Sequence, residues 1–243
     1  MFSSVKQLIR RPLEPESKGV KEAAGRLWIE KELAWACRGS AKDFAALRGL
    51  QRMKVNLGCG PDIRTGWLNV DLFRGPAPVI DPGKQPDTLL IRHDLRTGIP
   101  LEAGSCALIY SSHFFEHLSF ADGLRLMKDC YRALRPGGVF RIVLPDFRKC
   151  FDAYLRNDAD FFRLMDEYKL LAPFDPQLRT IVDYVNYCCY QWGEHIAIYD
   201  QEKLVRVLTS LGYRAVEPSS HQPDLDPGID LRTQYSFYTS ATK

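Results

Sequence analysis

The stretch that decides the fold is Lys54-Val55-Asn56-Leu57-Gly58-Cys59-Gly60-Pro61, which a second apolar run, Trp67-Leu68-Asn69-Val70-Asp71, follows closely. A buried parallel strand that runs into closely spaced glycines lets the backbone approach a ligand. An acid at the tip of the next strand can accept hydrogen bonds from two ribose hydroxyls. Together the two runs predict a nucleoside-binding site.

The spacing of these residues argues against a dinucleotide. A dinucleotide fingerprint needs a third glycine three residues after the second, where this chain has Ile63, and an acid about 20 residues further on. Asp71 comes only 13 residues after Gly58 (71 − 58 = 13). The connection from Cys59 to Gly66 is also too short for a full crossover helix. These features favour a mononucleoside and disfavour NAD.

Length and composition set the broad class of the protein. With 243 residues, 45% of them hydrophobic and 26% charged, the chain suits one globular α/β domain with an extension. A net charge of +3 is too small to indicate a nucleic-acid partner. Seven cysteines without a C-x-x-C pair argue for reduced thiols and a cytoplasmic location. No apolar run approaches the length of a membrane span.

Apolar runs alternate with helical segments along the rest of the chain. We expect helices at Phe120–Leu134 and Gln201–Leu211, each ending near a glycine. The expected strands are Lys54–Leu57, Trp67–Val70, Thr88–Arg92, Cys106–Tyr110, Val139–Leu144, Tyr213–Val216 and Tyr235–Ala241. This order predicts an α/β, Rossmann-like fold. Its seven-stranded, mostly parallel sheet carries helices on both faces and binds ligands beyond the carboxyl ends of the strands.

Two helical segments supplement this sheet. Residues 1–52 form an N-terminal helical extension, in which Ser40-x-x-Asp43 has the pattern of a capping box; the extension could pack on the sheet, cover the cofactor or pair with a second subunit in a homodimer. Residues 53–243 form the main domain. Within it, residues 147–193 are an insertion after the fifth strand, expected as helices Asp152–Leu171 and Pro176–Gln191. The insertion follows the carboxyl end of a strand, where a substrate cap would attach.

Several segments together resemble the class I S-adenosylmethionine-dependent methyltransferases, and specifically the methyltransferase type 11 subgroup. They follow one another in the order and spacing of that family, and the resemblance covers about residues 53–243. The segments are Leu57-Gly58-Cys59-Gly60-Pro61, Gly66-Trp67-Leu68-Asn69-Val70-Asp71, His93-Asp94-Leu95, Ser112-His113-Phe114-Phe115-Glu116-His117-Leu118 and Leu134-Arg135-Pro136-Gly137-Gly138. The resemblance implies S-adenosylmethionine as cofactor and S-adenosylhomocysteine as product.

The resemblance also implies positions for the cofactor. The expected contacts come from the glycine loop, from the ends of the second and third strands, and from the end of the fourth strand, which faces the methionine moiety. These cofactor-binding residues are Gly58, Cys59, Gly60, Asp71, Leu72, Asp94, Leu95, Ser111 and Ser112. Asp71 would take the ribose hydroxyls, and Asp94 would lie beside the adenine with Leu95 against the ring.

The acceptor side is predicted from residue chemistry at the same rim. A histidine near neutrality is a natural base for a hydroxyl proton, so His195 and His113 are the candidates, with the carboxylate of Asp146 as a third. Amphipathic rings that would contact the acceptor are Tyr187, Trp192 and Tyr199. The expected reaction is O-methylation of a small-molecule or saccharide hydroxyl, the saccharide being suggested by family analogy.

Other interpretations stay open at this stage. The run from His113 to His117 matches H-x-x-E-H, the inverted zinc-protease motif, although no helix that would present it is expected there. A metal-assisted sugar methyltransferase would use Glu116, His117 and Asp146 around magnesium. A relative that transfers an aminopropyl or carboxyl group would use the same nucleoside site. A binding module without catalytic activity is the alternative from a different class.

Overall fold

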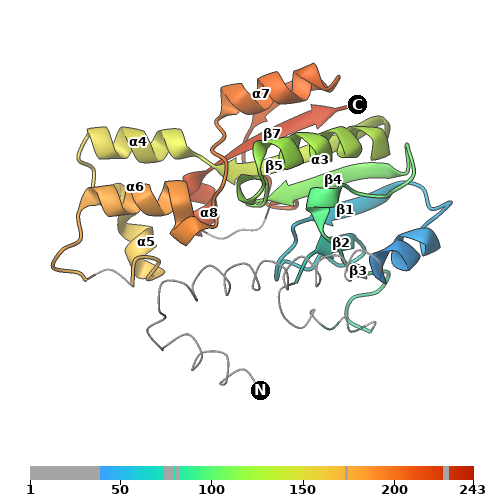
Figure 1. Cartoon of the computed structure of the whole chain (residues 1–243), viewed down its shortest axis with the longest axis horizontal. Coiled ribbons are helices and arrows are strands. Elements are labelled where there is room, and N and C mark those ends of the chain that lie inside the picture. The colour runs from blue at the N-terminus through green and yellow to red at the C-terminus, as the bar shows by residue number, and fades with distance from the viewer. Residues whose placement is uncertain (1–38, 74–78, 80, 82, 173–174, 227–229) are drawn as a thin grey trace, which may run out of the picture.

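A computed structural model describes residues 39–73, 79, 81, 83–172, 175–226 and 230–243 (Figure 1). Residues 1–38 of the predicted N-terminal helical extension lie outside the described residues, so the division at residue 52 and the homodimer stay predictions. No helix in the described part of the chain is long and apolar enough to cross a membrane.

The sheet has seven strands in the order β3-β2-β1-β4-β5-β7-β6. Pairing is parallel from β3 to β5, and β7 is antiparallel to both of its neighbours. The strands are β1 (Met53–Leu57), β2 (Leu68–Asp71), β3 (Leu89–Arg92), β4 (Cys106–Ser112), β5 (Leu134–Pro145), β6 (Arg214–Ser219) and β7 (Ser236–Thr242). The predicted Rossmann-like sheet is confirmed.

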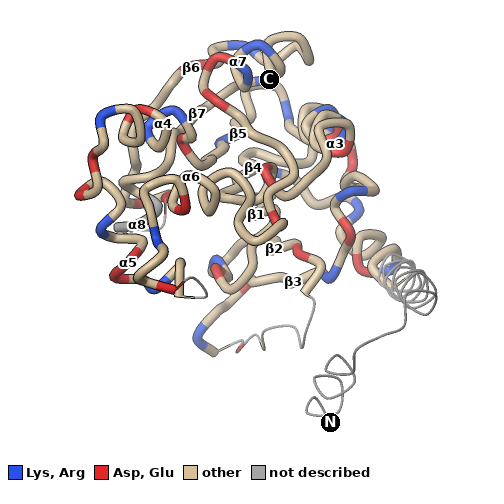
Figure 2. Tube along the Cα trace, turned by 60° about the vertical axis from the view of Figure 1, so that its left-hand side comes forward, with Lys and Arg blue, Asp and Glu red and all other residues tan. Residues whose placement is uncertain are grey.

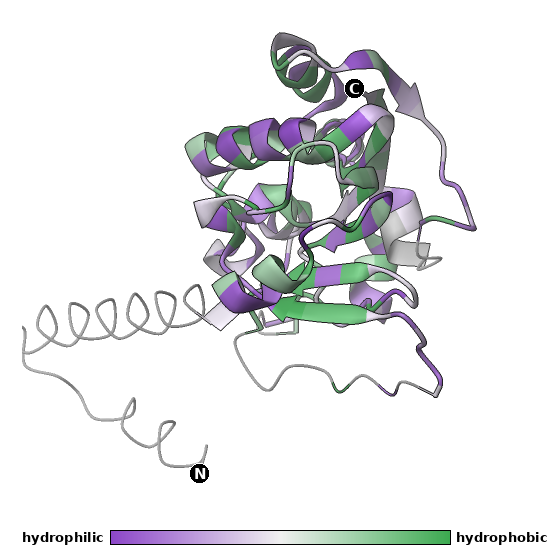
Figure 3. Ribbon diagram, turned by 90° about the vertical axis from the view of Figure 1, so that its right-hand side faces the viewer, coloured by the Kyte–Doolittle hydropathy of each residue, from purple (hydrophilic) through white to green (hydrophobic). Residues whose placement is uncertain are grey.

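Helices α3 (Phe120–Ala133) and α7 (Gln201–Ser210) pack against this sheet (Figure 1). Their inward faces join the fully buried β1 side chains Val55 and Leu57 in one hydrophobic core. Figure 3 shows the same pattern as mainly green strands beside helices whose turns alternate between green and purple. Basic and acidic residues are interspersed along the trace in Figure 2.

The connection between β1 and β2 is held by two buried asparagines, one on each strand. Asn69 donates to the carbonyl of Arg64 and accepts from its backbone N–H, while Asn56 donates to the carbonyl of Asp62. The guanidinium of Arg64 lies 3.7 Å from the ring centre of Tyr110. These bonds fix an irregular connection in place of a crossover helix, as its short length predicts.

One expected glycine cap and two predicted helix starts are wrong. Helix α3 ends at Ala133 and β5 begins at the next residue, so Gly137 lies within β5 and does not cap the helix. The insertion begins with α4 (Phe147–Leu155), which Asp146 caps by accepting from the Lys149 N–H. Ser40 lies within a helical segment that already includes Gly39, so it is not an N-cap.

The insertion is divided more finely than the sequence predicts. After α4 come a 3-10 turn (η3, Asp160–Phe162), α5 (Arg163–Glu167) and α6 (Ile181–Tyr190). Thr180 and Asp183 form the capping box that starts α6. Figure 1 shows α4, α5 and α6 gathered beyond one end of the sheet. They share a second hydrophobic core, separate from that of the sheet.

His93 ties the segment before β1 to the end of β3. Its Nδ1 accepts from the hydroxyl of Ser40 at 2.8 Å, and its Nε2–H donates to the carbonyl of Gly98 at 2.9 Å. A hydrogen-bonded, buried imidazole of this kind favours its neutral form. Burial lowers the pKa of His93, although the bond to Gly98 acts in the opposite direction.

We expect this histidine to make the fold sensitive to acid. Its folded pKa lies below the unfolded value of about 6.5, so its contribution is complete above that pH and is lost as the pH falls further. Urea unfolding between about pH 7.5 and about pH 5.5 should show a steeper loss of unfolding free energy for the wild type than for a folded His93→Gln variant. Equal slopes would contradict this assignment.

Candidate active site

The glycine loop lies at the carboxyl end of β1 and is shaped by Phe114. The N–H groups of Gly58 and Cys59 both donate to the carbonyl of Val70 on β2. Gly58 has φ +63°, and a Cβ built there would lie 2.2 Å from Cγ of Phe114. Gly60 has φ +50° but open space around the same position. Sequence reasoning missed Phe114, whose one local signal is an aromatic residue two positions after a strand.

Asp71, at the end of β2, closes the loop from the other side. Its Oδ2 accepts from the Gly60 N–H at 2.8 Å, and its Oδ1 accepts from the Phe73 N–H at 3.3 Å. The next residue, Leu72, accepts from Nε of Arg92 through its carbonyl. Cys59 is buried within the loop, and burial raises the pKa of its thiol, so the side chain stays protonated.

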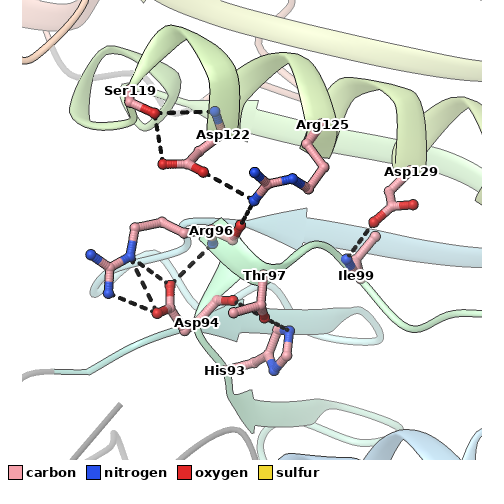
Figure 4. Close-up of polar contacts among 9 residues, drawn as sticks. All are labelled: His93, Asp94, Arg96, Thr97, Ile99, Ser119, Asp122, Arg125 and Asp129. Atoms are coloured by element: carbon pink, nitrogen blue, oxygen red, sulfur yellow. Dashed lines mark hydrogen bonds and ion pairs between the residues drawn. The ribbon is translucent and has the colours of Figure 1, made fainter. Parts of the chain in front are cut away.

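Asp94, at the end of β3, is bound by an arginine that the sequence analysis did not select. The Arg96 guanidinium donates to both carboxylate oxygens, at 2.7 Å to Oδ2 through Nη2, and the Arg96 N–H donates to Oδ1 (Figure 4). Burial acts to raise the pKa of Asp94, but these bonds outweigh it and the pKa is lowered. Leu95 begins the following 3-10 turn and is buried. The carbonyl of Arg96 accepts from Arg125, which joins this corner to α3.

The end of β4 lies between the glycine loop and the insertion. Ser111 donates to the carbonyl of Leu57 at 3.2 Å, which ties β4 to β1, and Ser112 is buried beside it. His113 follows with φ +51°, and its N–H donates to the carbonyl of Val143 on β5. This left-handed residue turns the chain from the strand towards the insertion.

A cavity of about 120 Å³ lies where the ends of β4 and β5 meet the insertion. Two imidazoles, those of His113 and His195, border it, and most of the remaining wall is apolar or aromatic. That wall consists of Pro145, Cys150, Met165, Leu170, Tyr187, Cys188, Gln191 and Tyr235. An engineered apolar cavity of about 150 Å³ binds benzene, so this space suits a group near the size of one ring.

The two histidines of the cavity are held differently. His113 has Ser236 Oγ at 2.7 Å from Nε2 and Glu116 Oε1 at 3.6 Å from Nδ1. His195 is buried, and its Nδ1 lies 2.7 Å from the carbonyl of Cys188. Its Nε2 has no hydrogen-bond partner among the described residues. Burial lowers the pKa of His195.

The other predicted acceptor residues lie in varied places. Tyr187 lines the cavity. Trp192 is exposed and packs edge-on against Tyr187, with the two ring centres 6.1 Å apart. Tyr199 is buried in the main core, where burial and the nearby Glu116 raise its pKa to about 12. Asp146 caps α4 and pairs with Lys149. Neither Tyr199 nor Asp146 borders the cavity, and roles for both in the reaction stay predictions.

The H-x-x-E-H segment lacks the helix that a zinc-protease motif requires. His113 directly follows β4 and lies in the left-handed region, and the residues Phe115–His117 form a 3-10 turn. The two histidines are therefore not one helical turn apart. The carboxylate of Glu116 is fully buried between them, with its Oε1 3.9 Å from Nε2 of His117.

The family of the central segment follows from its sequence. Residues 55–142, which run from β1 into β5 and include the glycine loop, match a family model described as a methyltransferase domain. They form a class I S-adenosylmethionine-dependent methyltransferase domain. The resemblance noted in the sequence is thereby confirmed for this part of the chain, and the cavity lies at the edge of the methyltransferase domain.

Solved structures of methyltransferases resemble the chain at low identity. An S-adenosylmethionine-dependent methyltransferase from Archaeoglobus fulgidus is 15% identical over 85% of this chain and 92% of its own, with a TM-score of 0.45. One from Mesorhizobium loti is 17% identical over 84% and 97%, with a TM-score of 0.43. Phosphoethanolamine N-methyltransferase 2 of Haemonchus contortus, solved with S-adenosyl-L-methionine, is 11% identical over 80% and 49%, with a TM-score of 0.43. No curated protein matches this chain.

Proposed function

We propose that this methyltransferase moves the methyl group of S-adenosylmethionine to a hydroxyl of a small acceptor held in the cavity. The observation that carries the proposal is the cavity itself, which borders the end of β4 and contains two imidazoles. In the reaction the acceptor oxygen attacks the methyl carbon as the bond from carbon to sulfur breaks. The acceptor proton passes to a base, and S-adenosylhomocysteine leaves. The protein mainly aligns the two reactants and excludes water.

The cofactor would lie across the carboxyl ends of β1 to β4. The positive φ of Gly58 and Gly60 supports a close approach of the cofactor to the backbone there. Asp71 is held between two backbone N–H groups, which leaves carboxylate lone pairs for ribose hydroxyls. Asp94 would lie beside the adenine, with Arg96 fixing the orientation of its carboxylate. We place the methionine moiety beside Ser111 and Ser112.

The lining of the cavity favours an apolar acceptor that carries one ring. A saccharide needs polar partners for several hydroxyls, whereas Pro145, Met165 and Leu170 offer none. We therefore favour the small-molecule branch of the sequence prediction, with a ring hydroxyl as the acceptor group. The cytoplasmic location stays a prediction.

His113 is the base that the geometry favours. It directly follows β4, and the next residue, Phe114, covers the glycine loop, so this histidine bridges the two halves of the site. Glu116 Oε1, 3.6 Å from Nδ1, can stabilise the imidazolium that forms when Nε2 takes the proton. Nε2 of His113 lies 2.7 Å from the hydroxyl oxygen of Ser236. A hydroxyl group can therefore hydrogen-bond to this nitrogen, as the hydroxyl of an acceptor would have to do.

Incubation with S-adenosylmethionine and a panel of hydroxylated ring compounds and saccharides tests this function. We expect S-adenosylhomocysteine and a singly methylated ring compound, detected by mass spectrometry. Methylation of saccharides alone would overturn the acceptor class. Transfer of an aminopropyl or carboxyl-bearing group would overturn the reaction, and binding of the cofactor without its consumption would indicate a binding module.

Asp71→Ala should weaken binding of S-adenosylhomocysteine about 10- to 100-fold, because hydrogen bonds to a charged group contribute about 1.5–3 kcal/mol. Calorimetric titration measures the change. Asp71 also holds the Gly60 N–H, so Asp71→Asn is the matched control, which keeps one acceptor oxygen and should bind more tightly than the alanine variant. An unchanged dissociation constant in folded Asp71→Ala would remove the ribose assignment.

A further inference from the structure

Two neighbouring side chains, those of Glu116 and His117, meet a third from a distant part of the chain, His195, beside the cavity. Ligand atoms of Glu116, His117 and His195 all lie within 4.8 Å of one another. Backbone bonds hold their segments together, because the N–H groups of Ile196 and Ala197 both donate to the carbonyl of Glu116, at 2.8 and 3.0 Å. The cluster is therefore a fixed feature of the junction between the turn after β4 and the chain after α6.

Both imidazoles are oriented by backbone carbonyls behind them. Nδ1 of His195 lies 2.7 Å from the carbonyl of Cys188, and Nδ1 of His117 lies 3.1 Å from that of Glu194. A carbonyl only accepts, so each Nδ1 carries the proton and each Nε2 presents a lone pair. A second ring nitrogen bound to a carbonyl is the usual arrangement of a histidine that binds a metal ion.

We propose that Glu116, His117 and His195 bind a divalent transition-metal ion, Zn²⁺ in the first instance. Two imidazoles and one carboxylate are a common three-ligand zinc set with an open fourth position. Imidazole ligands make magnesium a poor occupant. Asp146, which the sequence suggested as a ligand, is not part of the cluster, and His195 takes its place.

The distances and burial fit such an ion. Zinc bonds of about 2.0–2.2 Å place neighbouring ligand atoms about 3.4 Å apart, so small rotations of the side chains would close the cluster on the ion. The fully buried carboxylate of Glu116 supplies the negative charge that a buried cation needs. His117 is 29% exposed at its side chain and gives the ion a route from solvent.

A metal ion at this site would assist the methyl transfer proposed above. The existence of the metal site does not depend on that reaction. His195 borders both the cluster and the cavity, so a metal held by the cluster would lie beside the acceptor. A metal there would lower the pKa of a bound hydroxyl. Oε1 of Glu116 lies 3.6 Å from Nδ1 of His113 and 3.9 Å from Nε2 of His117, so the metal site and the proposed base would share this carboxylate.

Titration of the metal-free full chain with Co²⁺ tests the site without cofactor or acceptor. We expect one equivalent to give a visible d–d absorption band that Zn²⁺ abolishes by displacement. His117→Ala and His195→Ala should each weaken Zn²⁺ binding by more than about 100-fold, measured by competition with a chelating dye. His221→Ala is the matched control and should bind as the wild type does, because that ring packs against Tyr238 outside the cluster.

Each remaining outcome counts against the proposal. The site is overturned when the wild type binds no stoichiometric Co²⁺, or when folded His117→Ala retains wild-type affinity. A strong near-ultraviolet charge-transfer band would show that cysteine thiolates hold the ion. His117 is partly exposed, so its variant tests the ligand role even where His195→Ala does not fold. Methyl transfer that persists after removal of the metal would leave the binding result standing and refute only the activation of the acceptor.

Discussion

Replacing His113 with asparagine is expected to lower the turnover number by about 10²- to 10⁴-fold while leaving the affinity for S-adenosylhomocysteine within about twofold. General-base catalysis acts on the transition state, so removal of the base lowers the rate of the chemical step without removing cofactor contacts. Asparagine is the suitable replacement because His113 has φ +51°, and asparagine tolerates that left-handed conformation better than alanine does.

Two further variants separate proton transfer from support of the fold. Ser236→Ala removes the hydroxyl 2.7 Å from Nε2 of His113 but keeps the imidazole, so its effect on turnover should be much smaller. Glu116→Gln keeps the shape of the side chain without the charge and should lower turnover through poorer stabilisation of the imidazolium. A His113→Asn enzyme with wild-type turnover on an acceptor that the wild type methylates would assign the base elsewhere, first to His195.

Strands and the cofactor loop could be predicted because their signals are local. Apolar runs of four to seven residues, separated by glycine and proline, indicate strands without information from distant parts of the chain. The short connection between β1 and β2 likewise excludes a crossover helix from spacing alone. The hydrogen bond from Arg96 to Asp94 joins residues only two positions apart, so it could also have been predicted from the local sequence.

The failures arise where a distant residue decides the outcome. Ser40 has the local pattern of a helix cap, yet its hydroxyl is bonded to His93, 53 positions further along the chain. The sequence grouped Asp146 with Glu116 and His117, whereas the cluster of ligand atoms contains the distant His195; a ligand role for Asp146 stays a prediction. His195 reaches Glu116 through backbone bonds across about 80 residues of chain, and no periodicity encodes that contact.

Gly58→Ala is the second large effect that we expect. A Cβ at this position would lie 2.2 Å from Cγ of Phe114, and the residue has φ +63°. Overpacking costs about 1–3 kcal/mol and the left-handed conformation about 1–2 kcal/mol, so the variant should lose about 2–5 kcal/mol of unfolding free energy. Displacement of the loop or of Phe114 should also weaken cofactor binding by more than about 100-fold.

The neighbouring glycine separates the two causes. Gly60 has φ +50° but open space where a Cβ would lie, so Gly60→Ala should show the conformational cost alone, about 1–2 kcal/mol by urea unfolding. Phe114→Ala in the Gly58→Ala background removes the ring that clashes. The double variant should therefore be more stable than the sum of the two single changes predicts. Additive losses of unfolding free energy in the double variant would show that Phe114 does not press on the glycine loop. Close contact with Phe114 would then not be the reason for a glycine at position 58.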